Sequence, residues 1–280
     1  MAVLAIQSQV ARGHVGNSAG AFTLQRLGHE VWQMPTVLFS NHPGHGVYKG
    51  GAVEPDLIAD MVDALDEQGL LSKVEAVLSG YLGDPDQVEV IERAVERVKD
   101  QNPNALYICD PVIGDGDEVY VDENVREGIA EDLVPLADYV TPNRLELQKL
   151  LEHDEPVENI NDAIEKARML RCSNVIVTSI EDEPRYPGQI QTLLVAPNSA
   201  HVISMPKLDF DPKGAGDVLT AMFLSGLLKG KPVEQALAQA NGSLYDILAA
   251  THRAGADELV LIAQQERLVN PFTTAVISRA

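Results

Sequence analysis

The sequence predicts an α/β fold in which a central, mainly parallel β-sheet is flanked by helices, giving three α/β/α layers. Two observations predict it. Short runs of apolar and β-branched residues alternate with segments whose apolar residues recur at helical spacing, which is typical of βαβ units. No internal repeat, low-complexity tract or linker breaks the pattern, and 280 residues with 45% hydrophobic content can bury a large core. We therefore expect residues 1–280 to form one domain.

The first half of the chain is expected to contain four strand–helix units. Each strand is a short apolar run, and each following helix has apolar residues every three or four positions. The predicted strands are residues 3–7, 30–36, 76–79 and 105–109. The predicted helices are residues 18–27, 55–68, 86–100 and 124–133. Segments rich in turn-forming residues follow three of the strands: FSNHPGHGVYKGG, GYLGDP and DPVIGDG.

The second half departs from this alternation. The next predicted elements are strands at 139–140 and 174–178 and helices at 144–151 and 162–171. Residues 191–196 and 201–205 are apolar runs joined by PNSA, which predicts a β-hairpin. Three helices are expected after the hairpin, at 217–229, 233–253 and 257–268.

Polar side chains fall where the predicted strands end. In an open parallel sheet, ligands bind beyond the carboxyl ends of the strands. The residues at those ends are Ser8, Asn41, Tyr81, Asp110, Thr141, Thr178 and the glycine loop before residue 217. Their shared position predicts one ligand-binding cleft.

The most informative segment is DPKGAGDVLTAMFLSGLLKG, residues 211–230. Gly214, Ala215 and Gly216 precede Asp217, and an apolar run of helical period follows. Glycines allow a tight turn with exposed N–H groups, and a helix N-terminus adds partial positive charge, so the segment predicts an anion site. A carboxylate there would repel a phosphate, but it is useful if it removes a proton from a hydroxyl during phosphoryl transfer. The alternative is that Asp217 merely caps its helix.

Further carboxylates follow two strands. Asp110 ends the strand LYIC, and Asp115 comes five residues later. Beside a nucleotide they are suited to hold Mg²⁺ directly or through water, although an Asp before Pro is also common in turns. In TPNRLEL, Thr141 and Asn143 lie in a turn and Glu146 on the first turn of a helix. This spacing is that of a capping box, and a water-mediated metal role for Glu146 is the alternative.

Composition excludes several classes of function. The net charge of −21, from 42 acidic and 21 basic residues, argues against binding to nucleic acid or to anionic membranes. Cys109 and Cys172 lie in or beside apolar runs and are expected to be buried thiols. The chain has no P-loop, GxSxG, HExxH or CxxC motif. It also lacks a basic leader and any apolar run near the roughly 18 residues of a membrane span, so we expect a cytoplasmic protein.

Taken together and in order, these motifs resemble those of the ribokinase-like superfamily and, within it, the pyridoxal kinase family. The matching blocks are IQSQVARGHVGNSA, FSNHPGHG, LSGYLG, DPVIGD with YV after it, TPNRLEL, VIVTS and GAGD. They span about residue 3 to residue 268. GAGD alone indicates a sugar or vitamin kinase of this superfamily, whereas FSNH, SGYLG and DPVIGD narrow the resemblance to the vitamin B6 branch.

The resemblance implies a ribokinase-like fold, a homodimer, and transfer of the ATP γ-phosphate to the 5′-hydroxymethyl group of pyridoxal. It implies that Asp217 takes the hydroxyl proton, that the N–H groups of the glycine loop form the anion hole, and that Ser8 binds the pyridine ring. Tyr81 and the FSNH turn would enclose that ring. The residues implied for ATP are Asp110, Thr141, Asn143, Glu146, Thr178, Met205, Pro206, Lys207 and Leu208. Those implied for Mg²⁺ are Asp110, Asp115 and Glu146.

Two features depart from the family pattern. Many relatives have Thr after FSNH, whereas this chain places Pro43 and Gly44 on the substrate side. Proline has neither a hydroxyl nor an N–H, so one contact to the substrate ring is expected to be lost. The loop LDFDPK before the glycine loop is short and would cover ATP less fully. We expect altered vitamer affinity with the phosphoryl-transfer groups intact.

Two other functions are compatible with the motifs. One is a kinase for another hydroxymethyl heterocycle, such as hydroxymethylpyrimidine. The other is a carrier or sensor that binds pyridoxal with little turnover, because a fold does not dictate a function. The glycine loop with its aspartate argues against a carrier, since a carboxylate beside the anion site would not help to hold a phosphate.

Overall fold

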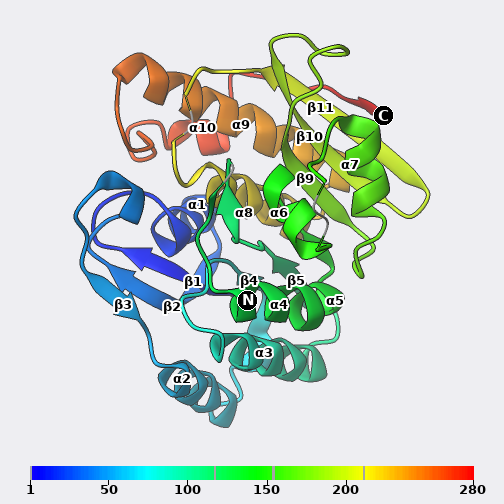
Figure 1. Cartoon of the computed structure of the whole chain (residues 1–280). Helices are drawn as coiled ribbons and strands as arrows, with labels where there is room; N and C mark the ends of the chain where they lie inside the picture. Colours follow the sequence, from blue (N-terminus) through cyan, green and yellow to red (C-terminus); the bar gives the residue numbers. More distant parts are fainter. Residues whose placement is uncertain (1, 117, 153–154, 211) are drawn as a thin grey trace.

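The computed structural model describes residues 2–116, 118–152, 155–210 and 212–280. Ten strands form its main sheet: β1 (Ala2–Val10), β2 (Glu30–Phe39), β3 (Gly50–Ala52), β4 (Val74–Ser79), β5 (Leu106–Cys109), β8 (Tyr139–Val140), β9 (Val175–Ile180), β10 (Gln189–Ala196), β11 (Ser199–Pro206) and β12 (Ile277–Arg279). Their order is β12-β11-β10-β9-β8-β5-β4-β1-β2-β3 (Figure 1). The strands from β9 to β2 in this order are parallel, and those beyond them are antiparallel.

Helices cover both faces of the sheet. One apolar cluster joins the sheet to α1 (Gly20–Arg26), α8 (Ala215–Leu228), α9 (Val233–Ala254) and α10 (Glu266–Val269). Two further clusters join the opposite face to α2 (Pro55–Glu67), α3 (Gln87–Gln101), α4 (Glu123–Gly128), α6 (Arg144–Leu150) and α7 (Ile160–Ala167). The short α5 (Val134–Leu136) precedes β8. The predicted α/β fold with three layers is confirmed.

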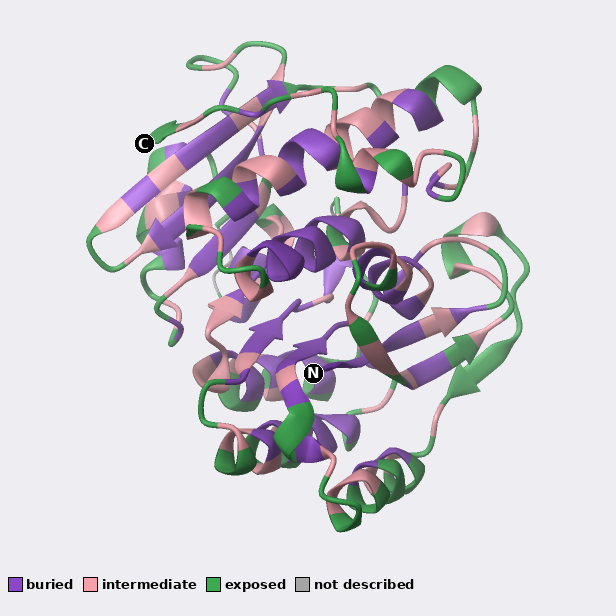
Figure 2. Ribbon diagram, turned by 180° about the vertical axis from the view of Figure 1, so that it is seen from behind, coloured by how far each residue is buried: buried purple, intermediate pink, exposed green. Residues whose placement is uncertain are grey.

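The sequence of the central elements explains their burial. In β1, Val3 packs with the first cluster, whereas Leu4 and Ile6 pack with the second, because successive side chains point to opposite faces of a strand. Residues 218–226 of α8 are all buried, which accounts for the absence of a polar face on this helix. Figure 2 shows this buried interior, in purple, along the central strands.

Several predicted elements have different limits in the structure. The predicted helix at 124–133 is α4 followed by a π-helical turn, Ile129–Leu133. The predicted helix at 257–268 is wrong for most of its length, since only α10 is a regular helix there. Leu259 and Leu261, two residues apart, are 1% and 0% exposed, and residues so spaced do not share one face of a helix.

The sequence patterns also missed short strands. β3, β12 and the small hairpin of β6 (Gly114–Asp115) and β7 (Glu118–Val119) contain only two or three residues each, too few for a periodic pattern. In the part of the chain that the structure describes, no helix combines the length and apolar character required to cross a bilayer.

Candidate active site

Asp217 lies in the first turn of α8, directly after the glycine loop. Gly214 is the N-cap of this helix and has a φ of 91°, in the left-handed region. A Cβ atom on Gly214 would lie 1.8 Å from the carbonyl oxygen of His14, so this position requires glycine. The close approach packs the glycine loop against the loop between β1 and α1.

The Asp217 carboxylate does not cap α8 from the N-cap position. It accepts hydrogen bonds from the backbone N–H of Gly16 and from its own N–H. Burial raises the pKa of Asp217 to about 6, and these hydrogen bonds oppose the rise. A carboxylate whose pKa lies near neutrality is suited to accept a proton from a substrate.

A second carboxylate, Asp110, is 7% exposed at the end of β5. Burial raises the pKa of Asp110 to about 7, repulsion from Asp217 adds to the rise, and hydrogen bonds with Thr141 and Thr220 oppose it. The Thr220 hydroxyl oxygen lies 3.3 Å from Oδ2 of Asp110 and 3.2 Å from Oγ1 of Thr141. Thr220 follows Asp217 by three residues on α8, so one helix face serves both carboxylates. The two carboxylates create a local excess of negative charge.

Glu146 completes the capping box of α6, and this interpretation of TPNRLEL is confirmed. Its Oε2 accepts a 2.7 Å hydrogen bond from the Asn143 N–H, and Asn143 Oδ1 accepts one of 2.9 Å from the Glu146 N–H. Oε1 accepts a third, of 3.0 Å, from the Ile113 N–H. Burial, with repulsion from Asp110, raises the pKa of Glu146 well above its ordinary value. This side chain therefore holds the DPVIG segment against the start of α6.

The predicted Mg²⁺ ligands differ in how well they suit a cation. Both Glu146 oxygens already accept backbone N–H groups, whereas Asp110 is repelled by Asp217. The Asp115 side chain is 32% exposed and pairs with Nζ of Lys213 at 2.5 Å. Among the described residues, no group of three or more His, Cys, Asp or Glu is arranged to hold a metal. Both Asp115 oxygens are engaged as well, because Oδ1 accepts the Gly116 N–H at 2.9 Å and Oδ2 pairs with Lys213. A cation at Asp110 would therefore share Asp115 with Lys213 and take most of its ligands from water.

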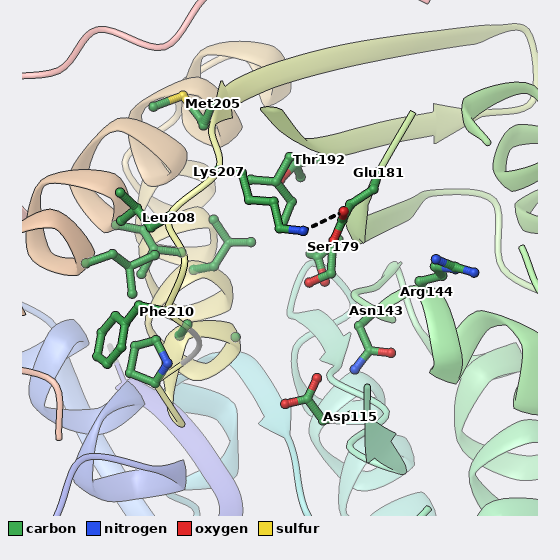
Figure 3. Close-up of a pocket in the computed structure, with 18 of the residues that line it drawn as sticks. Asp115, Asn143, Arg144, Ser179, Glu181, Thr192, Met205, Lys207, Leu208 and Phe210 are labelled. Carbon is green, nitrogen blue, oxygen red and sulfur yellow. Dashed lines mark hydrogen bonds and ion pairs between the residues drawn. The ribbon is translucent and has the colours of Figure 1, made fainter. Parts of the chain in front are cut away.

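A pocket of about 530 Å³ opens beside the glycine loop (Figure 3), within the range of small-molecule sites. Nine predicted site residues line it: Asp115, Asn143, Thr178, Met205, Pro206, Lys207, Leu208, Ala215 and Gly216. Figure 3 shows Met205, Leu208 and Phe210 along one side, and Asp115, Asn143 and Arg144 on the other. One side is therefore mainly apolar, as a nucleobase requires, and the other polar.

The remaining predicted residues lie outside this lining. They are Ser8, Pro43, Gly44, Tyr81, Asp110, Thr141, Glu146, Gly214 and Asp217. Asp110, Thr141 and Glu146 are buried beneath the polar side of the cleft, at 7%, 5% and 4% exposure. Of the residues predicted to bind the vitamer, Ser8 lies within β1, Pro43 and Gly44 follow β2, and Tyr81 follows β4.

Gly16 sets part of the geometry around Ser8. A Cβ on Gly16 would lie 2.2 Å from Oγ of Ser8, so only glycine leaves room for that hydroxyl. Pro43 and Gly44 lie in an exposed helical turn, Pro43–His45, where the Gly44 N–H donates to Nδ1 of His42 at 3.0 Å. The Gly44 N–H is therefore already used within the loop.

Sequence reasoning missed several residues of the site. The Tyr120 ring lies 6.2 Å from that of Tyr81, and burial, followed by repulsion from four carboxylates (Glu146, Asp115, Asp217 and Asp110), raises its pKa. Thr220 and Lys213 contact predicted carboxylates, and Phe210 lines the pocket. Tyr120 begins the YV pair that follows DPVIGD in the sequence. Its orientation depends on the β6–β7 hairpin, which the sequence did not predict.

The raised pKa of Asp217 predicts a pH-dependent change in stability. Its folded-state value of about 6 exceeds the ordinary 3.8, so its stabilising contribution is present at low pH and is lost as pH rises through about 6. We expect Asp217→Asn to unfold at a higher temperature than the native chain at about pH 8, with a smaller difference at about pH 5.5. Calorimetry at both pH values measures this, with the exposed Asp60→Asn as the matched control. A difference that stays constant with pH would contradict it.

Comparison with known proteins identifies the family. A family model described as phosphomethylpyrimidine kinase matches residues 16–260. The chain is 39% identical over 281 residues to a pyridoxal kinase PdxY of Leifsonia xyli, covering 100% of this chain and 99% of the relative. It is 42% identical over 274 residues to a pyridoxal kinase PdxY of Rubrobacter xylanophilus, covering 96% and 94%.

Comparison with solved structures indicates the same family. The pyridoxal kinase of Leishmania donovani in complex with ADP and pyridoxamine aligns with a TM-score of 0.92 at 30% identity, covering 99% of each chain. The pyridoxal kinase of Entamoeba histolytica aligns with a TM-score of 0.92 at 29% identity, covering 100% of this chain and 99% of that one. The chain therefore belongs to the pyridoxal kinases, phosphotransferases of the phosphomethylpyrimidine kinase family with the ribokinase-like fold.

Proposed function

We propose that this chain transfers the γ-phosphate of ATP to the 5′-hydroxymethyl oxygen of pyridoxal, giving pyridoxal 5′-phosphate. The observation that carries the proposal is the position of Asp217. Its carboxylate lies in the first turn of α8 and accepts the Gly16 N–H, while Ala215 and Gly216 of the same turn line the large pocket. A proton acceptor thus lies at the boundary between a nucleotide-sized pocket and the residues assigned to the vitamer.

On the nucleotide side, we assign the apolar wall formed by Met205, Pro206 and Leu208, with the backbone of Lys207, to the base of ATP. Asn143, Thr178 and the buried Thr141 lie toward the phosphates. The adjacent Asn143 and Thr178 form a parallel bridge, which holds the two strand ends together. The N–H groups of the glycine loop stabilise the charge on the transferred phosphoryl group.

On the vitamer side, Ser8 hydrogen-bonds the pyridine ring, with Tyr81 and the turn at Pro43 and Gly44 enclosing it. The 5′-hydroxyl oxygen attacks the γ-phosphorus, its proton passes to Asp217, and the bond to the β-phosphate oxygen breaks to release ADP. The Asp217 pKa of about 6 leaves the carboxylate ionised at neutral pH, ready to accept this proton.

We propose that Asp110 and Asp115 hold Mg²⁺, with Glu146 reached through water. When bound, the ion neutralises phosphate charge. The support is the position of Asp110 at the end of β5, beside the hydroxyl of Thr220, and the partial exposure of Asp115. Removal of divalent ions with a chelator is expected to abolish turnover, and turnover that persists after chelation would contradict the assignment.

We further propose a homodimer located in the cytoplasm, where ATP is available and thiols stay reduced. The exposed apolar residues Leu38, Val47, Tyr48, Leu57 and Met61 gather on β2, the loop after it and α2. Both cysteines are free thiols. Light scattering that gives the monomer mass of 30.3 kDa, rather than twice that value, would overturn the dimer.

The test of the function is an absorbance assay for pyridoxal 5′-phosphate with Mg·ATP and pyridoxal, pyridoxamine or pyridoxine. Steady formation of the phosphate from pyridoxal is expected. Tight pyridoxal binding without turnover would indicate a carrier or sensor. Because the matching family model is described as phosphomethylpyrimidine kinase, hydroxymethylpyrimidine is included as a competing substrate. Its preferential phosphorylation would overturn the assignment to pyridoxal.

A further inference from the structure

Glu258, in the segment after α9, contacts two loops from the other end of the chain. Its side chain is 13% exposed, and its Oε1 lies 2.9 Å from Nδ1 of His45. Its Oε2 accepts a 3.3 Å hydrogen bond from the His14 N–H, in the loop between β1 and α1. His45 belongs to the loop of residues 40–49 between β2 and β3, called here the substrate loop. Figure 1 shows the orange segment after α9 on the same side of the molecule as these blue loops.

The position of the Glu258 carboxylate is set by its surroundings. The next residue, Leu259, is 1% exposed, and its Cδ1 lies 3.4 Å from where a Cβ of Gly214 would be. The Val260 N–H donates to the buried hydroxyl of Thr251 at 3.2 Å. At Gly13, with φ of 105°, a Cβ would lie 2.4 Å from Oε1 of Glu258, so glycine permits the approach. The carboxylate is therefore held in place beside the glycine loop.

The substrate loop is held differently at its base and at its tip. At the base, the Ser40 N–H donates to the Lys49 carbonyl at 2.8 Å. The tip is the helical turn Pro43–His45. Nδ1 of His45 and Oε1 of Glu258 are both shielded from solvent, and neither makes a hydrogen bond to a described residue, so their 2.9 Å contact is an ion pair. Oε1 also lies 3.8 Å from Nη1 of Arg12, which belongs to the loop after β1. The pair therefore joins the tip to the rest of the molecule.

We propose that Glu258 is a positioning residue for the vitamer, because it holds the substrate loop closed through His45. The inference rests on the proposed function, which assigns the turn at Pro43 to the pyridoxal side. The lining of the nucleotide pocket includes neither Glu258 nor any residue of the substrate loop. Pro43 offers no hydroxyl to the ring. Enclosure by the substrate loop therefore contributes a larger share of the vitamer affinity than in relatives that have Thr at this position.

The test compares Glu258→Gln, His45→Asn and the double variant by steady-state kinetics and by calorimetric titration with pyridoxal. Each single change is expected to raise both the KM and the Kd for pyridoxal roughly tenfold, within the range of interaction energies between two residues in contact. The kcat and the KM for ATP stay unchanged, because the lost contact contributes equally to ground state and transition state. The double variant is expected to be no worse than either single one, since both remove the same contact.

Asp257→Asn is the matched control, because Asp257 is the adjacent carboxylate, 66% exposed, and pairs at 3.0 Å with Arg12, whose Nη1 also lies 3.8 Å from Oε1 of Glu258. It tests whether Arg12, rather than His45, carries the effect. It should leave the KM for pyridoxal unchanged. A lower unfolding temperature with an unchanged pyridoxal KM in Glu258→Gln would show a structural role only and overturn the inference. So would an equal rise in the KM for ATP, or an equal effect of Asp257→Asn.

The two proposals can fail separately. If the native chain binds pyridoxal without phosphorylating it, the proposed function fails, and the pyridoxal Kd of the variants still decides the role of Glu258. If Glu258→Gln does not fold, His45→Asn, in the partly exposed turn, provides the same measurement. If the native chain does not bind pyridoxal, both proposals are overturned.

Discussion

Replacement of Asp217 by Asn is expected to lower kcat for pyridoxal phosphorylation by at least about a hundredfold, the usual scale for a lost general base. The amide cannot take the hydroxyl proton, yet it is isosteric with the carboxylate and can still accept the hydrogen bond from the Gly16 N–H. Binding of pyridoxal and of ATP should therefore change little.

The measurement is the rate of pyridoxal 5′-phosphate formation at saturating substrates, with both dissociation constants determined by calorimetry. In the native chain, kcat/KM is also expected to fall as pH drops through about 6, because Asp217 becomes protonated. Asp60→Asn, on the exposed surface of α2, should keep the native rate and pH profile. A near-native rate in the Asp217→Asn protein would contradict the assignment of this residue as the base.

Replacement of Gly214 by Ala is expected to disrupt both stability and catalysis. The new Cβ would meet the His14 carbonyl oxygen at 1.8 Å, and the residue would have to keep a φ of 91°. The left-handed conformation alone costs a non-glycine residue about 1–3 kcal/mol, and the clash adds to this. Because relief of the clash must move the glycine loop, we expect kcat to fall by roughly a hundredfold, as when an oxyanion-hole donor is lost.

Chemical denaturation gives the free energy of unfolding, and the phosphate assay gives kcat. Gly216→Ala is the control for stability, because no atom lies within 4 Å of the Cβ it would add. It lies inside α8, where alanine is favoured over glycine, so its free energy of unfolding should be unchanged or higher. Equal stability of the two variants would contradict the close packing of the glycine loop on the β1–α1 loop.

The glycine loop is a part of the site that could be predicted in some respects from the sequence. The residues of the turn and the helix after it are consecutive, so their spacing alone predicted the anion site and the position of Asp217. The sequence does not distinguish a capping role of Asp217 from a role toward a substrate, because the answer depends on Gly16, about two hundred residues earlier. The same holds for Glu146, whose capping box is local but whose contact with Ile113 is not.

The α/β class, the main parallel strands and the hairpin of β10 and β11 could be predicted from the sequence alone. These features follow from periodicity and turn chemistry, which act between near neighbours in the chain. The expectation that polar residues lie at strand ends held for Tyr81, Asp110 and Thr141, whereas Ser8 and Thr178 lie within β1 and β9. The sequence prediction failed at 257–268, where Leu259 and Leu261 both enter the core because of what packs around them.

Which of the predicted residues lie together depends on the folded chain. The folded chain separates the nine predicted residues that line the pocket from the nine that do not, brings Tyr120 toward four carboxylates, and places Glu258 beside His45. These contacts join segments far apart in sequence, and they form only when the sheet order brings the strand ends and the closing loops to one edge. No local pattern encodes such a pairing, because its free energy comes from burial and charge shared among distant residues.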